Sequence, residues 1–185
     1  MKDTMTLQDM PRAQARAGAL SFDALVLAEQ GALARLARRL VWDAEEARDL
    51  VQSALADAYE KRGSLRDLQA GPAWLRRILV SRAMSHLRRR RVWQVLRDAL
   101  DLGPVPPPSP EESFSGAERW HAFGRALRGL PTQQATAFSL RYLEGLELDA
   151  IADAMNISRG TVRIHLYRAL QKLKAADALR GDDTP

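Results

Sequence analysis

A proline run near the middle of the chain limits its fold more than any other feature. Five of the nine prolines lie between Gly103 and Pro110, in the sequence GPVPPPSP. Proline fixes φ and lacks a backbone N–H, so this segment is extended and cannot be helical. The run predicts two domains, and an ordinary surface loop is the alternative, although structureless loops this long are uncommon inside one domain. The expected parts are a leader (1–20), a first domain (21–96), a flexible linker (97–117), a second domain (118–176) and a polar tail (177–185).

Apolar residues recur at helical spacing in both domains, and no stretch alternates in the manner of a half-buried strand. In the first domain, helices are expected to begin after Ser21, after Asp43 and near Pro72, because Ser and Asp cap helices and Pro suits a first turn. The second domain is expected to contain helices over residues 118–129, 131–145, 147–155 and 159–175. The predicted fold class is therefore all-α, with two small helical domains.

Composition excludes several kinds of function. The chain has no cysteine, so disulfides, thiolate metal sites and thiol nucleophiles are excluded. Its three histidines, His86, His121 and His165, are far apart in sequence, so we expect no metal and no cofactor. We also find no nucleophile–base pair and no phosphate-binding loop, which argues against an enzyme. No apolar run is long enough for a membrane helix, and no secretory signal is visible, so we expect a cytoplasmic protein without membrane insertion of its own.

The C-terminal part has the pattern of a helix-turn-helix. A short helix is followed by Asn156, which tolerates the left-handed conformation, and by Ser158, which can cap the next helix. Residues 156–174 carry five cations and no acid on a chain whose net charge is +5. A helical hairpin with a solvated basic face is the alternative, but the absence of any acid favours DNA binding.

A second basic run lies between Trp74 and Trp93, where seven arginines occur without an acid. Like charges at this density repel each other unless a polyanion pairs with them. Trp74 can stack on unpaired bases or can equally anchor the core. The four arginines of residues 88–91 can also complement the dipole of a solvated helix end.

Residues 43–60 have the opposite charge, with six acids and one internal arginine. Asp49 and Gln52 are three residues apart and share a helix face. Such a face can serve solubility or can dock a protein partner, and composition alone does not separate the two.

The order of these segments resembles that of bacterial extracytoplasmic-function (ECF) sigma factors, the smallest promoter-specificity subunits of RNA polymerase. The resemblance rests on DAEEARDLVQSALADAY, AWLRRILVSRAMSHLRRR and LRGLPTQQATAFSLRYLEGLELDAIADAMNISRGTVRIHLYRALQKLK. It implies a first domain that binds core RNA polymerase and the −10 promoter element, and a second domain with a helix-turn-helix that binds the −35 element. It also implies control by an anti-sigma protein.

The resemblance also implies site residues, position by position. For polymerase binding they are Asp49, Gln52, Asp57 and Glu60. For the −10 element they are Arg66, Asp67, Gln69, Arg76, Arg77 and Ser81, of which the first three lie in a loop that matches the segment that captures a flipped base. The basic run adds Trp74, Arg88 and Arg89 as candidates for the same element. For the −35 element they are Ser158, Arg159, Thr161, Arg163, His165 and Arg168.

The chain departs from the family pattern at five of these or neighbouring positions. Family members often carry Asn and Asp at positions 81 and 85, where this chain has serines. They often carry Ser and Arg at positions 164 and 165, where this chain has Ile and His, and Gly at position 156. The preferred promoter bases therefore do not follow from the family pattern.

Two other classes of function compete with this interpretation. A stand-alone helix-turn-helix regulator, or a response-regulator output domain, would bind duplex DNA tightly by itself and would not need the acidic face around Asp49. A nucleic-acid hydrolase would need clustered histidines or paired carboxylates, which the sequence does not provide.

Overall fold

The structure is a computed structural model that describes residues 10–100 and 115–181, and every regular element in these ranges is helical. The all-α prediction is confirmed for this part of the chain. The elements are α1 (Met10–Val41), α2 (Ala44–Lys61), the short 3₁₀ turns η1 (Arg62–Ser64) and η2 (Leu68–Ala70), α3 (Gly71–Ala99), α4 (Ser115–Gly129), α5 (Thr132–Phe138), the π-turn η3 (Ser139–Leu143), α6 (Leu148–Met155) and α7 (Arg159–Gly181).

Three of the expected helix boundaries are confirmed by their capping geometry. Asp43 precedes α2, and its Oδ1 accepts a hydrogen bond of 2.8 Å from the backbone N–H of Glu46. Asn156 ends α6 in the left-handed conformation, with φ 54° and ψ 49°. Ser158 precedes α7, and its Oγ accepts a hydrogen bond of 3.1 Å from the backbone N–H of Thr161. These local bonds satisfy backbone groups that a helix end leaves unpaired.

The expected helix start at Ser21 is wrong. Helix α1 begins at Met10 and continues through Ser21 to Val41 without a break. The segment before Ser21 is rich in alanine and arginine, which are strong helix formers, and Gly18, three residues before Ser21, does not stop the helix. The serine therefore lies inside a helix rather than at its cap.

Other boundaries differ by a few residues from the expected ones. Helix α3 continues to Ala99, α4 begins at Ser115 and α7 continues to Gly181. The helix expected from Pro131 to Gly145 changes at Ser139 into the π-turn η3. The proline run itself lies outside the described residues, as do residues 1–9 of the leader and 182–185 of the tail.

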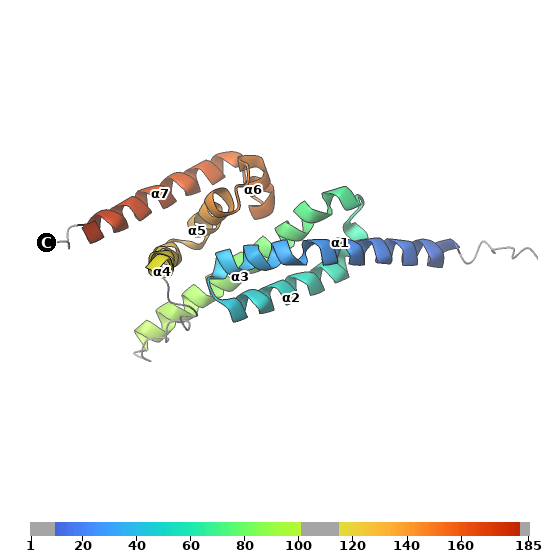
Figure 1. The fold of residues 1–185 in the computed structure, drawn as a ribbon, viewed down its shortest axis with the longest axis horizontal. Coiled ribbons are helices and arrows are strands. Elements are labelled where there is room, and N and C mark those ends of the chain that lie inside the picture. The colour runs from blue at the N-terminus through green and yellow to red at the C-terminus, as the bar shows by residue number, and fades with distance from the viewer. Residues whose placement is uncertain (1–9, 101–114, 182–185) are drawn as a thin grey trace, which may run out of the picture.

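Helices α1, α2 and α3 pack side by side as one domain, and α4 to α7 form the second (Figure 1). Leu36, Leu50 and Leu79 are among the buried residues of the first domain, and Leu140 and Ile151 are among those of the second. All five belong to one continuous apolar cluster, because α5 and α6 pack against α3. Burial of apolar surface therefore holds the two domains together as well as holding each domain together.

Polar contacts reinforce this domain contact. Arg77 on α3 donates a hydrogen bond of 2.9 Å to the Oδ1 of Asn156 in the helix-turn-helix turn. Arg39 on α1 forms an ion pair of 2.7 Å with Glu144 and also donates to the backbone carbonyl of Leu143, at the end of η3. A carbonyl at the end of a helix has no backbone N–H of a following turn to accept from. The Arg39 guanidinium supplies the missing donor to the Leu143 carbonyl.

Trp42 lies at the contact between the two domains. It follows α1 with φ 60°, an unusual backbone conformation for a bulky residue. Its ring lies edge to face against Phe123 of α4, with a centroid distance of 6.1 Å. A Cβ added to Gly124 would lie 2.5 Å from the Cε3 of Trp42, so only glycine fits at that position of α4. The described chain is therefore in a closed arrangement of its two domains.

Candidate nucleic-acid interface

Helix α7 has one face in the core and one in solvent. Val162, Leu166 and Ala169 are buried against the rest of the second domain. On the other face Arg163 and Arg168 are exposed. Two guanidinium groups on the solvent face of a capped helix can read guanine edges or bind phosphates in a major groove.

The residues at the start of α7 contribute mainly to its geometry. The hydroxyls of Ser158 and Thr161 share a hydrogen bond of 2.8 Å, and Ser158 also caps the helix. Arg159 is exposed and forms an ion pair of 3.5 Å with Asp149 on α6. This pair orients the Arg159 side chain toward α6. Arg159 lies at the N-terminal end of α7, the end that would enter a groove first.

His165 differs from the other expected −35 residues. Both of its ring nitrogens are buried and have no hydrogen-bond partner among the described residues. Burial, together with the nearby charge of Arg168, lowers the pKa of the His165 imidazole below its ordinary value. The ring is therefore neutral at pH 7 and does not present a donor to solvent in this arrangement.

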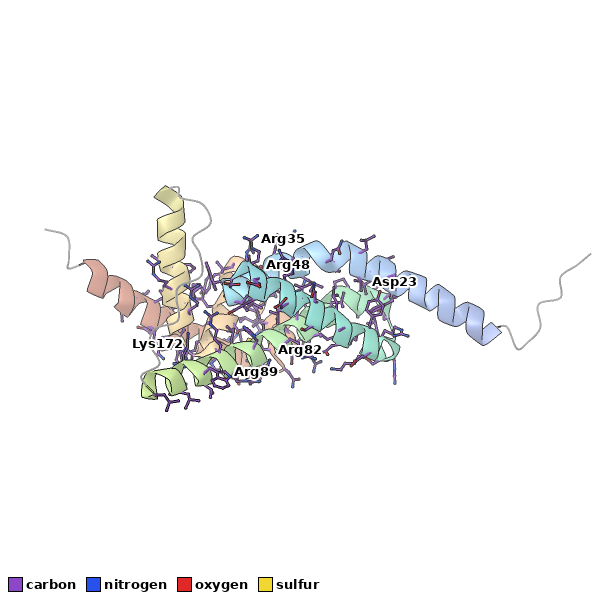
Figure 2. All side chains as sticks on the ribbon, turned by 90° about the horizontal axis from the view of Figure 1, so that it is seen from below. Asp23, Arg35, Arg48, Arg82, Arg89 and Lys172 are labelled. Carbon is purple, nitrogen blue, oxygen red and sulfur yellow. The ribbon has the colours of Figure 1, made fainter. Side chains whose placement is uncertain are left out.

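The second basic surface runs along α3. Arg77, Ser81, Arg88 and Arg89 are exposed, and Arg76 is half-buried. Figure 2 shows Arg82 and Arg89 along this helix. The exposed guanidiniums give this helix a cationic side that suits a phosphate backbone.

Trp74 lies at the start of α3 and packs on the core cluster. Its ring lies edge to face against Phe22, with a centroid distance of 6.3 Å. The side chain is nevertheless half-exposed rather than buried. The packing supports the core-anchor interpretation, and the exposed part of the ring leaves a face on which a base can stack.

The loop between α2 and α3 presents its polar residues to solvent. Arg66, Asp67 and Gln69 are all exposed. Asp67 is held in place because its Oδ1 accepts a hydrogen bond of 2.8 Å from the backbone N–H of Gln69. The loop therefore presents an ordered, solvent-exposed polar surface next to the arginines of α3.

The acidic face on α2 divides into free and paired carboxylates. Asp49, Gln52 and Glu60 are exposed, and their side chains make no hydrogen bond or ion pair within the described residues. Asp57 is paired with Arg82 through both carboxylate oxygens. The hydrogen bonds from Arg82 hold the pKa of Asp57 below its ordinary value. The three unpaired groups are thus available to a partner, whereas Asp57 is committed to the contact between α2 and α3.

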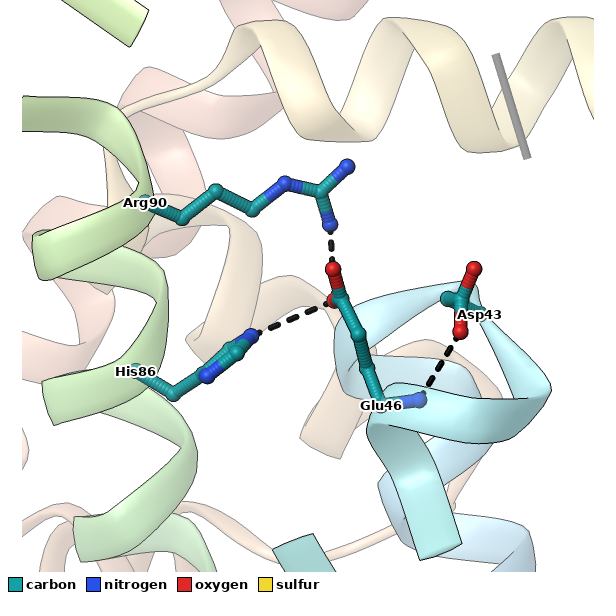
Figure 3. A network of polar contacts seen from close by, with 4 residues as sticks. All are labelled: Asp43, Glu46, His86 and Arg90. Atoms are coloured by element: carbon teal, nitrogen blue, oxygen red, sulfur yellow. Dashed lines mark hydrogen bonds and ion pairs between the residues drawn. The ribbon is translucent and has the colours of Figure 1, made fainter. Parts of the chain in front are cut away.

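A polar network that the sequence did not single out joins the start of α2 to α3 (Figure 3). Glu46 accepts from Arg90 at 2.8 Å and lies 3.2 Å from the Nε2 of His86. Sequence reasoning also missed Arg39, Trp42 and Arg128, because their surroundings are set by the other domain and no local pattern signals them. The only feature of the sequence that pointed to this network was the acid-rich segment around Glu46.

In the part of the chain that the structure describes, neither a metal-binding cluster nor a membrane-spanning helix accompanies these surfaces. Across residues 10–100 and 115–181 no three His, Asp or Glu side chains gather in a way that would hold a metal ion. The same part of the chain has no helix with the length and apolar character to cross a bilayer.

Comparisons with known proteins identify the class of this fold. The family model described as Sigma-70 region 2 matches residues 25–92, and the one described as Sigma-70, region 4 matches residues 120–173. The chain is 34% identical over 160 residues to an RNA polymerase sigma-E factor of Streptomyces coelicolor, covering 84% of this chain and 85% of the relative. It is 33% identical to an RNA polymerase sigma-H factor of Pseudomonas aeruginosa, covering 95% and 93%.

A solved structure gives the same result for the fold. The sigma factor RpoE of Bartonella quintana, in complex with the anti-sigma factor NepR, matches with a TM-score of 0.65 and 26% identity, over 83% of this chain and 94% of that one. The fold and the two matched regions define a promoter-specificity subunit of bacterial RNA polymerase. The chain belongs to the extracytoplasmic-function family of sigma factors, as its sequence segments indicated. Proteins of this family direct core RNA polymerase to promoters.

Proposed function

We propose that each element of the promoter is read by a different domain of this chain. The first domain (21–96) binds the −10 element through α3 and the loop before it, and the second (118–176) binds the −35 element through α7. The observation that carries this proposal is that two cationic surfaces lie on separate helices of separate domains. The linker (97–117) joins the two domains, and the leader (1–20) and tail (177–185) flank them.

The residues proposed for these contacts are those whose side chains can reach a partner. On α7 they are Arg163 and Arg168. Arg159 joins them when it leaves its ion pair with Asp149 and binds a phosphate instead. Ser158 and Thr161 shape the start of the helix, and His165 reaches DNA only after a change in its burial. On the first domain they are Arg66, Asp67, Gln69, Trp74, Arg76, Arg77, Ser81, Arg88 and Arg89.

Core polymerase binds the acidic face of α2 in this proposal. Asp49, Gln52 and Glu60 supply the contacts, and Asp57 fixes the face against α3. Charge-assisted hydrogen bonds to a basic partner contribute about 1.5–3 kcal/mol each when they are desolvated. The chain itself supplies no catalytic group in this proposal, because polymerase performs the chemistry. We place the chain in the cytoplasm.

The closed arrangement has to open before both elements are bound. The −10 and −35 elements are centred about 25 base pairs apart, which is ~85 Å of duplex at ~3.4 Å per base pair. Helix α6 of the −35 reader packs directly on α3 of the −10 reader. Two surfaces on touching helices do not span that distance, so promoter binding by both domains requires their separation.

The closed arrangement also suits control by an inhibitory protein. The RpoE of Bartonella quintana, which this chain resembles, was crystallised with an anti-sigma factor. We infer that a 1:1 anti-sigma protein holds the present chain closed and covers α2 and α7 together. The chain has no cysteine, so a redox signal would have to act on the partner rather than on thiols of this chain.

Run-off transcription tests the proposed function. Core RNA polymerase with this protein is expected to produce promoter-specific transcripts, and core polymerase alone is not. If the purified protein instead binds one duplex tightly and core polymerase gains no promoter specificity, the chain acts as a stand-alone regulator. Hydrogen exchange with the inhibitor present is expected to show protection of both residues 43–60 and residues 159–173.

A further inference from the structure

Two large apolar side chains remain in solvent on the outward face of α7. Ile164 is exposed over 50% of its surface and Tyr167 over 64%. They are three residues apart, so they are neighbours on one face of the helix. Val162 and Leu166 already fill the core face of the same helix, which packs on α4, α5 and α6 of its own domain. Core packing therefore does not use Ile164 and Tyr167, and both are accessible to a ligand.

Arginines flank this apolar pair. An α-helix turns by about 100° per residue, so the order around the solvent face is Arg163, Tyr167, Ile164 and Arg168. Both arginines are exposed. The middle of this face is thus apolar, and its two edges are positively charged.

Gly160 continues the middle of the face toward the start of α7. It is exposed and lies one turn before Ile164. A Cβ added there would meet the Oγ of Ser158 at 3.7 Å, an ordinary contact, so packing within the chain does not require glycine. The absence of a side chain leaves the helix backbone uncovered at this point. A helix that enters a major groove can therefore approach the base edges closely there and bring Ile164 down to them.

This arrangement matches one chemical feature of the major groove. Phosphates line the two walls of the groove and attract the flanking arginines, while the middle of the helix face meets the base edges. The C5-methyl of thymine is the apolar group that base edges present there. Because an isoleucine side chain makes no hydrogen bonds, it would leave the amino group of a cytosine unpaired at the same position. Ile164 therefore favours thymine over cytosine.

We propose that Ile164 is a specificity-determining residue that selects a thymine of the −35 element through contact with its C5-methyl group, with Tyr167 packing beside it. This inference rests on the proposed function, in which α7 reads that element. It adds a base preference that the guanidiniums of Arg163 and Arg168 do not supply, because guanidiniums bind guanine edges or phosphates. The −35 element of this chain therefore contains a thymine at one position whose methyl group contributes to binding.

Promoter selection followed by removal of single methyl groups tests the inference. Core RNA polymerase with the full chain transcribes a library of promoters randomised across the −35 element, and the enriched sequences reveal the selected thymines. Each selected thymine is replaced singly by deoxyuridine, which lacks only the methyl group, and binding of each duplex by the polymerase complex is measured by competition. Cytosine and 5-methylcytosine at the same position form a second pair.

The same duplexes are measured with three variants. Ile164→Ser removes the apolar surface, and Ile164→Val keeps most of it. Leu27→Ser is the matched control, because it removes an apolar side chain that is exposed by 68% on α1 of the other domain. All three variants change exposed side chains, so each is expected to fold as the wild type does.

At one selected thymine, deoxyuridine should weaken binding by the wild type roughly fourfold, the equivalent of about 0.8 kcal/mol for one buried methyl-sized group. Methylation of cytosine at that position should strengthen binding by a similar factor. Ile164→Ser should be insensitive to both changes, whereas Ile164→Val and Leu27→Ser should respond as the wild type does.

The outcomes separate this inference from the proposed function. If polymerase with the wild-type chain gains no promoter preference, the proposed function fails and this inference fails with it. If −35 sequences are enriched but no thymine responds to loss of its methyl group, or if Ile164→Ser responds as the wild type does, the inference alone is wrong. Weaker binding by Ile164→Ser that is equal for all −35 sequences would assign the side chain to a protein contact and would also overturn the inference.

Discussion

Gly124 lies on α4 where the ring of Trp42 approaches the helix backbone, and replacing it with alanine tests whether this contact closes the two domains. The added Cβ would lie 2.5 Å from Cε3 and 2.9 Å from Cζ3 of the ring. Carbon atoms pack at about 3.5–4.0 Å, so the ring or the helix has to move by roughly 1 Å. Trp42 already has a φ of 60°, which leaves its backbone little freedom to adjust.

The size of the effect follows from this overlap. Overpacking of a well-packed contact costs about 1–3 kcal/mol. Alanine also favours a helix over glycine by up to about 1 kcal/mol, but this gain applies to α4 in the open and the closed protein alike and cancels in their ratio. Gly124→Ala should therefore lower the ratio of closed to open protein by roughly 5–150-fold.

The domain distance measures that ratio directly. The chain has no cysteine, so Ala34→Cys and Gln171→Cys give two specific dye positions, one on each domain. Energy transfer should fall in Gly124→Ala, and binding of a double-stranded promoter probe by the protein with core polymerase should increase.

Gly31→Ala is the matched control. Gly31 is exposed on α1, and a Cβ there would meet only the flexible end of Arg35 at 3.6 Å. This variant gains the same helix propensity without a clash. Unchanged energy transfer in Gly124→Ala, or an equal change in Gly31→Ala, would show that the Trp42 contact does not hold the domains together.

Three further predictions concern other surfaces. Replacing Asp49 and Gln52 together with alanine should weaken co-purification with core polymerase at unchanged helix content, since both are exposed and unpaired; equal co-purification would remove α2 as the docking face. Arg163→Ala should reduce promoter use and, if the guanidinium reads a guanine, relax selectivity at one base pair by about 1–3 kcal/mol, which a panel of promoter variants measures. The pKa of Asp57 is lowered by Arg82, so this pair stabilises the fold above the ordinary pKa of Asp and the stabilisation is lost as pH falls through the lowered value. The free energy of unfolding measured in urea should therefore differ more between wild type and Arg82→Ala at about pH 6 than at about pH 3. An equal difference at the two pH values would contradict the pairing.

The sequence by itself determined that both domains are helical, the three helix boundaries at Asp43, Asn156 and Ser158, and the distribution of charge. Asp43, Asn156 and Ser158 act on backbone groups within a few residues of themselves, so the local sequence is enough to predict their roles. The basic runs and the acidic segment are likewise local in sequence, and helical spacing places each on one surface. The resemblance to a sigma factor rests on the same local segments, which is why it was available before the fold.

The tertiary structure alone decided how the two domains meet. Arg39 reaches Glu144 across 105 positions and Arg77 reaches Asn156 across 79, and no pattern within a helix or turn carries such a pairing. The same holds for Gly124, which looks like a weak point in a helix until the ring of Trp42 is placed against it. Contacts between residues far apart in sequence depend on the shape and exposed apolar surface of two finished domains, and those exist only once the chain has folded.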